Sequence, residues 1–220
     1  MRTAAFFDVD NTLVKGFTQK IFADYLLKKK ELSFFAYAGI ASWFIAYRLF
    51  NFRLDKSAVR NKPIEALTGK KKADLDSLAE HCFEEQIKPR IFPGTRELIK
   101  EHQEKGDEII LVSTSMDAII DRIKEHLGLK FTLCTKLETR DGVYTGRIDG
   151  PIMYGENKVK SVRQFAAARE LNLSGSSAYS DHISDLPLLE LVGNPGAVNP
   201  DARLEKICRE RKWPAFRFRF

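Results

Sequence analysis

The sequence contains few cysteines and no pattern that would cross-link the chain. Cys82, Cys134 and Cys208 are an odd number, are widely spaced and form no C-x-x-C pair. This spacing argues against a disulfide framework and against a structural zinc site, so we expect a reducing, cytoplasmic location. The N-terminal apolar run stops at Asp8 without a small-residue cleavage site after it, and we therefore expect no signal peptide.

The sequence also lacks an apolar run of membrane-spanning length. The uncharged stretch Ser33–Tyr47 has 15 residues, whereas a transmembrane helix needs about 20. This stretch is apolar around most of the helix circumference, while a surface helix normally has a polar face. Two placements stay open for it: a fully enclosed helix, or a helix that contacts an apolar partner.

No repeats, low-complexity tracts or nucleic-acid-binding motifs occur, and we expect no nucleic-acid partner. The 220 residues include 36 Lys and Arg against 30 Asp and Glu, a formal net charge of +6. This balance suggests an anionic partner, although solvated helix faces account for most scattered basic residues. Length and composition are those of a globular protein with one domain and a large insertion, or with two small domains.

Alternating apolar runs and amphipathic segments predict an α/β fold. We expect strands near residues 4–9, 108–112, 131–134, 177–180, 196–198 and 216–220, and a hairpin around Asp141-Gly142 within 137–148. Helices are expected over 95–105, with Thr95 as a cap, and over 116–127, 159–171 and 184–192. Residues 17–86 have helical periodicity. This order predicts a doubly wound, mostly parallel, Rossmann-like core of residues 1–15 and 90–220, with residues 16–89 inserted as an all-helical cap.

Acidic residues follow the first predicted strand. Asp8 and Asp10 lie two positions apart, so an extended chain would place both carboxylates on one side. A buried charge without a partner costs roughly several kcal/mol. A metal ion, or a phosphate together with its counter-charges, would balance these carboxylates. An ordinary turn at Asp10-Asn11 is the alternative explanation.

Chemically useful side chains also follow the later strands, where parallel sheets bind ligands. Ser113-Thr114-Ser115 would bind a phosphate or simply cap a helix, and Lys158 precedes a predicted helix as a phosphate contact or a surface lysine. Asp181 and Asp185 lie four positions apart after another strand. That spacing suits one carboxylate on a divalent ion and one in its outer shell.

Taken together and in this order, these motifs resemble the haloacid dehalogenase superfamily of aspartate-nucleophile phosphatases. The hairpin, the helical insertion after the first motif and the run Tyr179–Asp201 are similar to subfamily IB, which includes phosphoserine phosphatase. The resemblance covers nearly the whole chain and is loosest in the insertion. It implies a Mg²⁺-dependent phosphomonoester hydrolase that works through an aspartyl-phosphate.

The resemblance also implies a role for each motif residue. Asp8 would be the nucleophile and Asp10 the general acid and base. Mg²⁺ would bind Asp8, the Asp10 carbonyl oxygen and Asp181. The expected contacts of the phosphate are Asn11, Ser113, Thr114 and Lys158. Asp185 would orient Lys158 or a metal-bound water.

Two positions depart from the subfamily pattern. Phosphoserine phosphatases usually place a glutamate shortly after the first motif to bind the substrate ammonium, and Val14–Thr18 contains none. His182 stands where many relatives have a small residue. We expect its side chain to point to solvent at a helix start, with tuning of a metal-bound water as the alternative.

The predicted cap suggests several substrates. It is rich in aromatic residues, most of which we expect inside a helical bundle, but the apolar helix 33–50 leads us to the hypothesis of a lipid phosphate and a peripheral contact with the inner membrane face. The basic residues Lys28–Lys30, Arg48 and Arg53 would suit anionic headgroups. The alternatives are a small metabolite phosphate, phosphoserine, a phosphotransferase reaction and a non-catalytic phosphate-binding module. The oligomeric state is not predicted.

Overall fold

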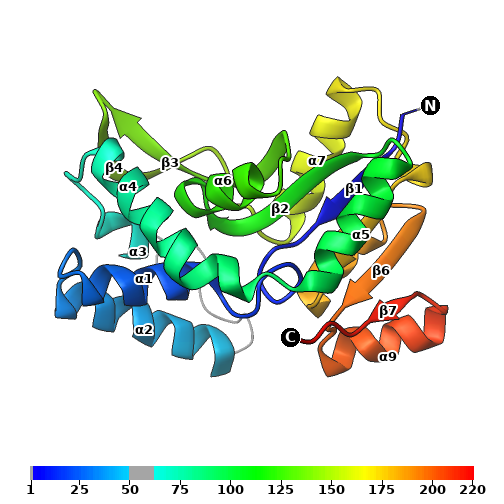
Figure 1. Cartoon of the computed structure of the whole chain (residues 1–220), viewed down its shortest axis with the longest axis horizontal. Helices are drawn as coiled ribbons and strands as arrows, with labels where there is room; N and C mark the ends of the chain where they lie inside the picture. The colour runs from blue at the N-terminus through cyan, green and yellow to red at the C-terminus, as the bar shows by residue number, and fades with distance from the viewer. Residues whose placement is uncertain (1, 50–61) are drawn as a thin grey trace.

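A computed structural model describes residues 2–49 and 62–220, and within them one sheet organises the chain (Figure 1). Its strand order is β4-β3-β2-β1-β5-β6-β7. Neighbouring strands are parallel except in the antiparallel β3–β4 hairpin. The strands are β1 (Ala4–Phe7), β2 (Glu108–Met116), β3 (Phe131–Arg140), β4 (Val143–Asp149), β5 (Ser177–Ser180), β6 (Asn194–Val198) and β7 (Ala215–Phe216). The expected doubly wound, mostly parallel α/β fold is confirmed.

Helices connect the strands and cover both faces of the sheet (Figure 1). The longer ones are α1 (Thr18–Lys28), α2 (Phe34–Leu49), α4 (Lys72–Cys82), α5 (Pro93–Glu104), α6 (Asp117–His126), α7 (Glu156–Ala168) and α9 (Ala202–Arg211). The shorter ones are α3 (Lys62–Glu65), α8 (Leu186–Leu189), η1 (Phe83–Ile87), η2 (Lys88–Arg90), η3 (Leu173–Gly175) and η4 (Ile183–Asp185).

Strand β1 is buried on both faces, because its alternating side chains enter two separate hydrophobic cores. Ala5 and Phe7 belong to the core formed with α5 and α6. Ala4 and Phe6 belong to the core formed with α7, α8 and α9. This is why the first apolar run is continuous rather than alternating.

The segment between β1 and α5 is helical in its described residues. The core on the α5 and α6 face continues into this segment, since it contains Phe22 of α1 and Leu75 of α4 together with Ile120 of α6. The helical segment therefore packs directly on the sheet layer and shares its hydrophobic core. Within the described residues, no helix has the length and apolarity that a membrane span requires.

Several element boundaries differ from the sequence-based expectations. Strand β2 runs on to Met116 instead of ending near Val112, so residues 113–115 are extended and α6 begins one residue later than expected. Thr95 does not cap α5, because its hydroxyl donates to the Thr12 carbonyl oxygen at 3.1 Å. Helix α7 begins at Glu156, which places Lys158 inside its first turn. At the C-terminus, only Ala215–Phe216 pair as the expected edge strand.

Candidate active site

A cluster of charged side chains lies at the carboxyl ends of the central strands. Asp8 directly follows β1, and its backbone N–H donates to the Tyr179 carbonyl oxygen of β5 at 2.9 Å. Asp181 directly follows β5, and Lys158 lies in the first turn of α7. Crossover connections of the parallel sheet bring these residues to one edge although they are far apart in the chain.

Lys158 joins two of these motifs. Its Nζ atom lies 2.7 Å from Asp8 Oδ1 and 2.8 Å from Asp185 Oδ2, and its side chain is 3% exposed. The Ser180 hydroxyl donates to the same Asp185 oxygen at 2.8 Å. Burial opposes the charged amine, but the Asp185 and Asp8 carboxylates outweigh it and raise the pKa of Lys158. Lys158 is therefore a fixed cation between two acidic motifs.

Asp8 is buried beside this cation. Burial raises the pKa of Asp8 to about 7, with Lys158 opposing the rise and Asp185 and Asp10 adding to it. A carboxylate that stays charged in such a place is poorly solvated, and Lys158 supplies the positive charge beside it. The Thr12 hydroxyl lies 3.4 Å from its other oxygen.

Asp10 is held by hydroxyl groups instead of a cation. Its Oδ1 atom accepts from the Thr18 N–H at 2.9 Å and from the Thr18 hydroxyl at 2.7 Å. Ser115 Oγ donates to Oδ2 at 3.3 Å and lies 2.7 Å from the Thr18 hydroxyl. Burial raises the pKa of Asp10 although the Thr18 hydrogen bonds oppose it. Asp10 is thus fixed in orientation while its protonated form stays accessible.

Thr18 and Ser115 were not among the expected site residues. Thr18 is the first residue of α1, and Ser115 lies near the end of β2. Ser115 belongs to the hydroxyl run Ser113-Thr114-Ser115, which was expected at the site, whereas a threonine at a helix start has no distinguishing pattern. Ser180 was also missed, because a serine at a strand end is common.

The Asp181 carboxylate makes no hydrogen bond or ion pair among the described residues, and the charge of Lys158 only partly offsets the effects that raise its pKa. Partial burial, followed by the nearby Asp8, Asp185 and Asp10 carboxylates, raises the pKa of Asp181 to about 9. The edge thus gathers four carboxylates around one buried cation, Lys158. An excess of negative charge in a poorly solvated place requires a further cation or protons.

The donor atoms at this edge fit a hard divalent cation such as Mg²⁺. The expected ligands are the carboxylates of Asp8 and Asp181 and the carbonyl oxygen of Asp10, all oxygen donors of the kind that Mg²⁺ binds. In residues 2–49 and 62–220, no three His, Cys, Asp or Glu side chains form a metal-binding group. The expected set needs only two side chains, since its third donor is a backbone oxygen.

The expected phosphate contacts differ in what their side chains do. Ser113 is buried, and its Oγ atom accepts from the Ser115 N–H at 3.1 Å. The Thr114 hydroxyl donates to the Met153 carbonyl oxygen at 2.9 Å, and Asn11 Oδ1 accepts from the Gly16 N–H at 2.9 Å. Asn11 and Thr114 therefore hold the loops of the site in this structure.

His182 caps a short helix at the rim of the site. Its Nδ1 atom accepts from the Ser184 N–H at 3.1 Å, at the start of η4. Its Nε2 atom lies 3.4 Å from Asp201 Oδ2, and the side chain is 40% exposed. The helix-start position agrees with the expectation for this residue, but its ring lies between Ser184 and Asp201 instead of pointing freely to solvent.

Fold and site together define an α/β protein with an acidic, lysine-bridged centre at the carboxyl edge of its parallel strands. A family model of haloacid dehalogenase-like hydrolases matches residues 5–190. The chain therefore belongs to the haloacid dehalogenase-like hydrolase family, and the expectation that it is a phosphatase of this family is confirmed.

Similar proteins extend this result over the whole chain. Phosphoserine phosphatase SerB1 of Mycobacterium tuberculosis is 37% identical over 224 residues, which cover 100% of this chain and 72% of that protein. The histidinol-phosphatase of Neisseria meningitidis serogroup C is 35% identical over 224 residues and 100% of both chains.

Solved structures show the same fold. A protein of unknown function from Bordetella pertussis Tohama I superposes with a TM-score of 0.89 at 28% identity, over 98% of both chains. A phospho-aspartyl intermediate analogue of phosphoserine phosphatase superposes with a TM-score of 0.69 at 21% identity, over 98% of this chain and 92% of that one. At this identity the second likeness bears on the fold alone.

Proposed function

We propose that this chain hydrolyses phosphomonoesters with Mg²⁺ through an aspartyl-phosphate formed on Asp8. The observation that supports this best is the buried contact of Lys158 with both Asp8 and Asp185, at 2.7 and 2.8 Å. A lysine enclosed by two carboxylates is costly to build and is only a weak source of stability. Its position beside a strand-end aspartate suits the capture of a phosphate dianion.

In this proposal Asp8 is the nucleophile. One of its carboxylate oxygens attacks phosphorus while the bond from phosphorus to the ester oxygen breaks, so that one hydrolysis becomes two easier steps. Attack of a carboxylate on a dianion is opposed by charge repulsion. Lys158 lies where it offsets this repulsion, and the Ser113 hydroxyl would bind a phosphoryl oxygen.

Asp10 serves as general acid and then as general base. Its protonated form gives a proton to the departing ester oxygen, and its carboxylate then takes one from the water that hydrolyses the aspartyl-phosphate. The raised pKa of Asp10 supports the first role, and the hydrogen bonds from Thr18 support the second, because they favour the charged form. Thr18 also connects Asp10 to the first helix of the insertion.

Asp8, Asp181 and the Asp10 carbonyl oxygen would hold the Mg²⁺ ion. When bound, the ion supplies positive charge to the phosphoryl oxygens and balances the acidic residues. We also propose that residues 16–89 form the cap over this site. The hydrogen bonds between Thr18 and Asp10 support this division, since they place the start of the cap directly at the charged centre.

The test is to trap the covalent intermediate. The protein is mixed with Mg²⁺ and a phosphomonoester labelled on phosphorus, quenched in acid, digested and mapped. We expect one labelled peptide, containing Asp8, and free phosphate as the final product. Label on another residue would refute the nucleophile assignment, and an absence of turnover would favour a non-catalytic phosphate-binding module. Transfer of label to an added alcohol would favour a phosphotransferase.

A lipid phosphate is a second candidate substrate, supported by the exposed face of α2. Phe34 is 68% exposed and Phe35 is 87% exposed, whereas Ile40 on the same helix is buried. The exposed lysines Lys28–Lys30 lie shortly before this helix. The side chains of Arg48 and Arg53 lie outside the part of the chain that the structure describes. Flotation with anionic liposomes tests this candidate, and unchanged kinetics without binding would count against it.

A further inference from the structure

The turn between β6 and α9, Asn199-Pro200-Asp201, contacts both acidic loops of the charged centre. It ends the run Tyr179–Asp201, but none of its three residues has a role in the chemistry proposed above. Its two polar residues make hydrogen bonds to the loop after β1 and to the loop after β5. The turn therefore connects the two segments that would each supply ligands to Mg²⁺.

Asn199 connects the turn to the loop after β1. Its Nδ2 atom donates to the Asn11 carbonyl oxygen at 3.3 Å, and the Asn11 N–H donates to the Val14 carbonyl oxygen at 2.7 Å. Both asparagines are left-handed, with φ of +49° at Asn199 and +59° at Asn11, a conformation that asparagine adopts more readily than most residues. The Asn199 amide thus holds the backbone of the residue that directly follows Asp10.

The end of the chain orients the Asn199 amide. Its Oδ1 atom accepts from the Phe218 N–H at 2.9 Å, and the Asn199 N–H donates to the Phe216 carbonyl oxygen at 2.8 Å. The Phe218 ring packs over Gly94 at the start of α5 so closely that an added Cβ would overlap it. Because an N–H group can bond only to the oxygen of the amide, the contact with Phe218 leaves Nδ2 facing Asn11.

Asp201 connects the turn to the loop after β5. Its N–H donates to the Asp181 carbonyl oxygen at 2.7 Å, and its Oδ2 atom accepts from the Ile183 N–H at 3.2 Å. Its Oδ1 atom accepts from the Leu204 N–H at 2.7 Å and so caps α9. Asp201 is therefore fixed on its own helix and holds the backbone of an expected Mg²⁺ ligand.

We propose that this turn positions the two acidic loops relative to each other, with Asn199 as the positioning residue for the loop that contains Asp10. The proposal rests on the proposed function, because it concerns the geometry of the same site. Mg²⁺ demands near-ideal octahedral geometry, so ligands from two loops must be held at a fixed separation. Residues that orient metal ligands from behind typically change metal affinity about 10- to 100-fold when they are replaced.

The test measures the dissociation constant of Mg²⁺ by calorimetry, without substrate. Asn199→Asp keeps the size of the side chain and the oxygen that accepts from Phe218, but it replaces the donor to Asn11 by an oxygen atom. We expect the Kd for Mg²⁺ to rise on the order of 10-fold. The added negative charge would by itself strengthen the binding of a cation, so weaker binding would report the lost positioning.

The same change at Asn194 is the matched control. Asn194 is the first residue of β6, at the strand end away from the turn, and its Nδ2 atom donates to the Gly175 and Ser176 carbonyl oxygens at 3.1 and 3.4 Å. Asn194→Asp therefore also removes an amide donor to the backbone and adds one negative charge. It should leave the Kd for Mg²⁺ unchanged.

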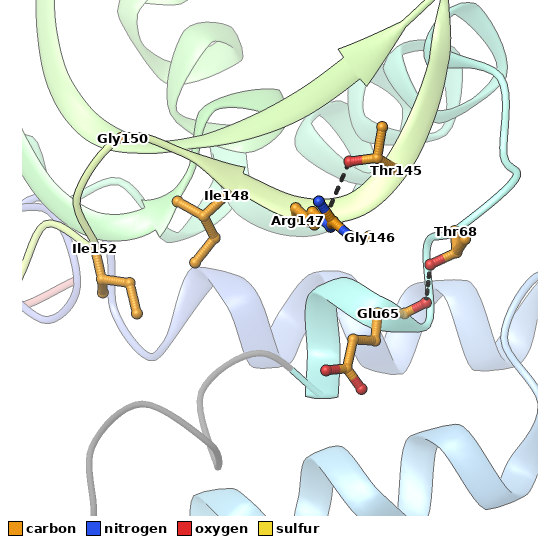
Figure 2. A pocket seen from close by; sticks show the side chains of 8 residues that line it. All are labelled: Glu65, Thr68, Thr145, Gly146, Arg147, Ile148, Gly150 and Ile152. Carbon is orange, nitrogen blue, oxygen red and sulfur yellow. Dashed lines mark hydrogen bonds between the residues drawn. The ribbon is translucent and has the colours of Figure 1, made fainter.

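A second variant and a second control involve no change of charge. Asn199→Gly accepts the left-handed backbone and removes the amide, so the Kd for Mg²⁺ should rise here as well. Figure 2 shows Thr145 in the wall of a cavity of about 600 Å³ between the end of α3 and β4. The described residues that line this cavity include none of the charged centre. Thr145→Val removes a hydrogen bond to Glu138 there and should leave the Kd unchanged.

The outcomes separate this proposal from the proposed function. An unchanged Kd in both Asn199 variants, with thermal unfolding showing that they are folded, would overturn the positioning role. An equal rise of the Kd in Asn194→Asp would also overturn it, because the effect would then be one of general stability. Mg²⁺ binding without turnover of any phosphomonoester by the unaltered protein would instead contradict the proposed function alone.

Discussion

Two polar clusters lie against the same central strands. In one of them negative charge is in excess, whereas in the other every polar group has a partner. On one face of β1, Lys158 faces the Asp8 and Asp185 carboxylates, with further acidic residues nearby. On the other face, His102 of α5 lies 2.6 Å from Asp107 and 2.8 Å from the Tyr179 hydroxyl of β5. Successive residues of a strand point to opposite faces, which is why Asp8 and Phe7 enter different clusters.

The histidine cluster is closed within the protein. Both ring nitrogens of His102 have partners, Thr3 donates to Asp107, and the Tyr179 ring stacks on Phe7 with centroids 4.9 Å apart. A satisfied buried network of this kind holds elements in register. The acidic cluster has a surplus of negative charge that the residues described in the structure do not neutralise. The comparison identifies the unbalanced cluster as the one that needs ligands, and the balanced one as structural.

The change with the largest expected effect is Asp8→Asn. It removes the nucleophile, so kcat should fall by roughly a thousandfold or more, on the scale of other removed nucleophiles. The fold should persist, because the change lowers the negative charge of an overcharged cluster. Steady-state assays measure the loss of kcat, and circular dichroism measures whether the fold persists. Residual turnover near that of the unaltered protein would refute the assignment of Asp8.

Lys158→Met should damage both activity and stability. It leaves the Asp8 and Asp185 carboxylates buried without their cation, and breaking a buried ion pair in this way costs roughly 3–5 kcal/mol. Urea unfolding measures this loss. If the free energy of unfolding were unchanged, the two carboxylates would have to be solvated or protonated without the lysine.

Mg²⁺ binding should release protons and change the dependence of stability on pH. Asp181, with its pKa raised to about 9, is protonated in the metal-free protein at pH near 7.5, so binding should release about one proton. Calorimetry in buffers of different ionisation enthalpy measures this number, and Asp181→Asn should abolish the release. Binding without proton release would contradict the place of Asp181 among the ligands.

The same carboxylates determine whether the free energy of unfolding rises or falls with pH. Their folded pKa values, about 7 for Asp8 and about 9 for Asp181, lie above the ordinary 3.8. Between these values the folded state binds more protons than the unfolded state, so the free energy of unfolding of the metal-free protein falls as pH rises. Excess Mg²⁺ should reduce this fall, as thermal unfolding from pH about 5 to 9 would show. A fall of equal size with and without Mg²⁺ would contradict metal binding at these residues.

Tyr179→Phe should have the smallest effect, and only on stability. It leaves a buried nitrogen of His102 without its partner, which costs about 1–3 kcal/mol. Because the hydroxyl lies on the face away from Asp8, kcat/KM should stay within about twofold. A large loss of activity would show that the two clusters are coupled through β1 and β5.

The sequence predicted the core of the fold well because its strands are buried on both faces. Continuous apolar runs such as Ala4–Phe7 and the Asp141-Gly142 hairpin follow from local rules, and both occur in the structure. The expected boundaries were wrong where tertiary contacts decide them. Residues 113–115 stay extended at the end of β2, where the chain continues beside β3 up to Met116.

The acidic residues of the candidate site could be predicted from the sequence, but the residues that hold them in position could not. Asp8 and Asp10 stand out because two carboxylates after an apolar run are unusual. Thr18, Ser115 and Ser180 are common residues in common places, and only their distances to Asp10 and Asp185 reveal what they do.

The sequence by itself determined the α/β class, the helical insertion and the acidic residues at the strand ends, because these depend on local periodicity and on residue type. Only the tertiary structure decided which charges meet. Lys158 lies 150 positions from Asp8 and 27 from Asp185, yet its amine contacts both. The physical reason is the parallel part of the sheet, whose crossovers bring the carboxyl ends of its strands to one edge, where separate weak motifs become a single charged site.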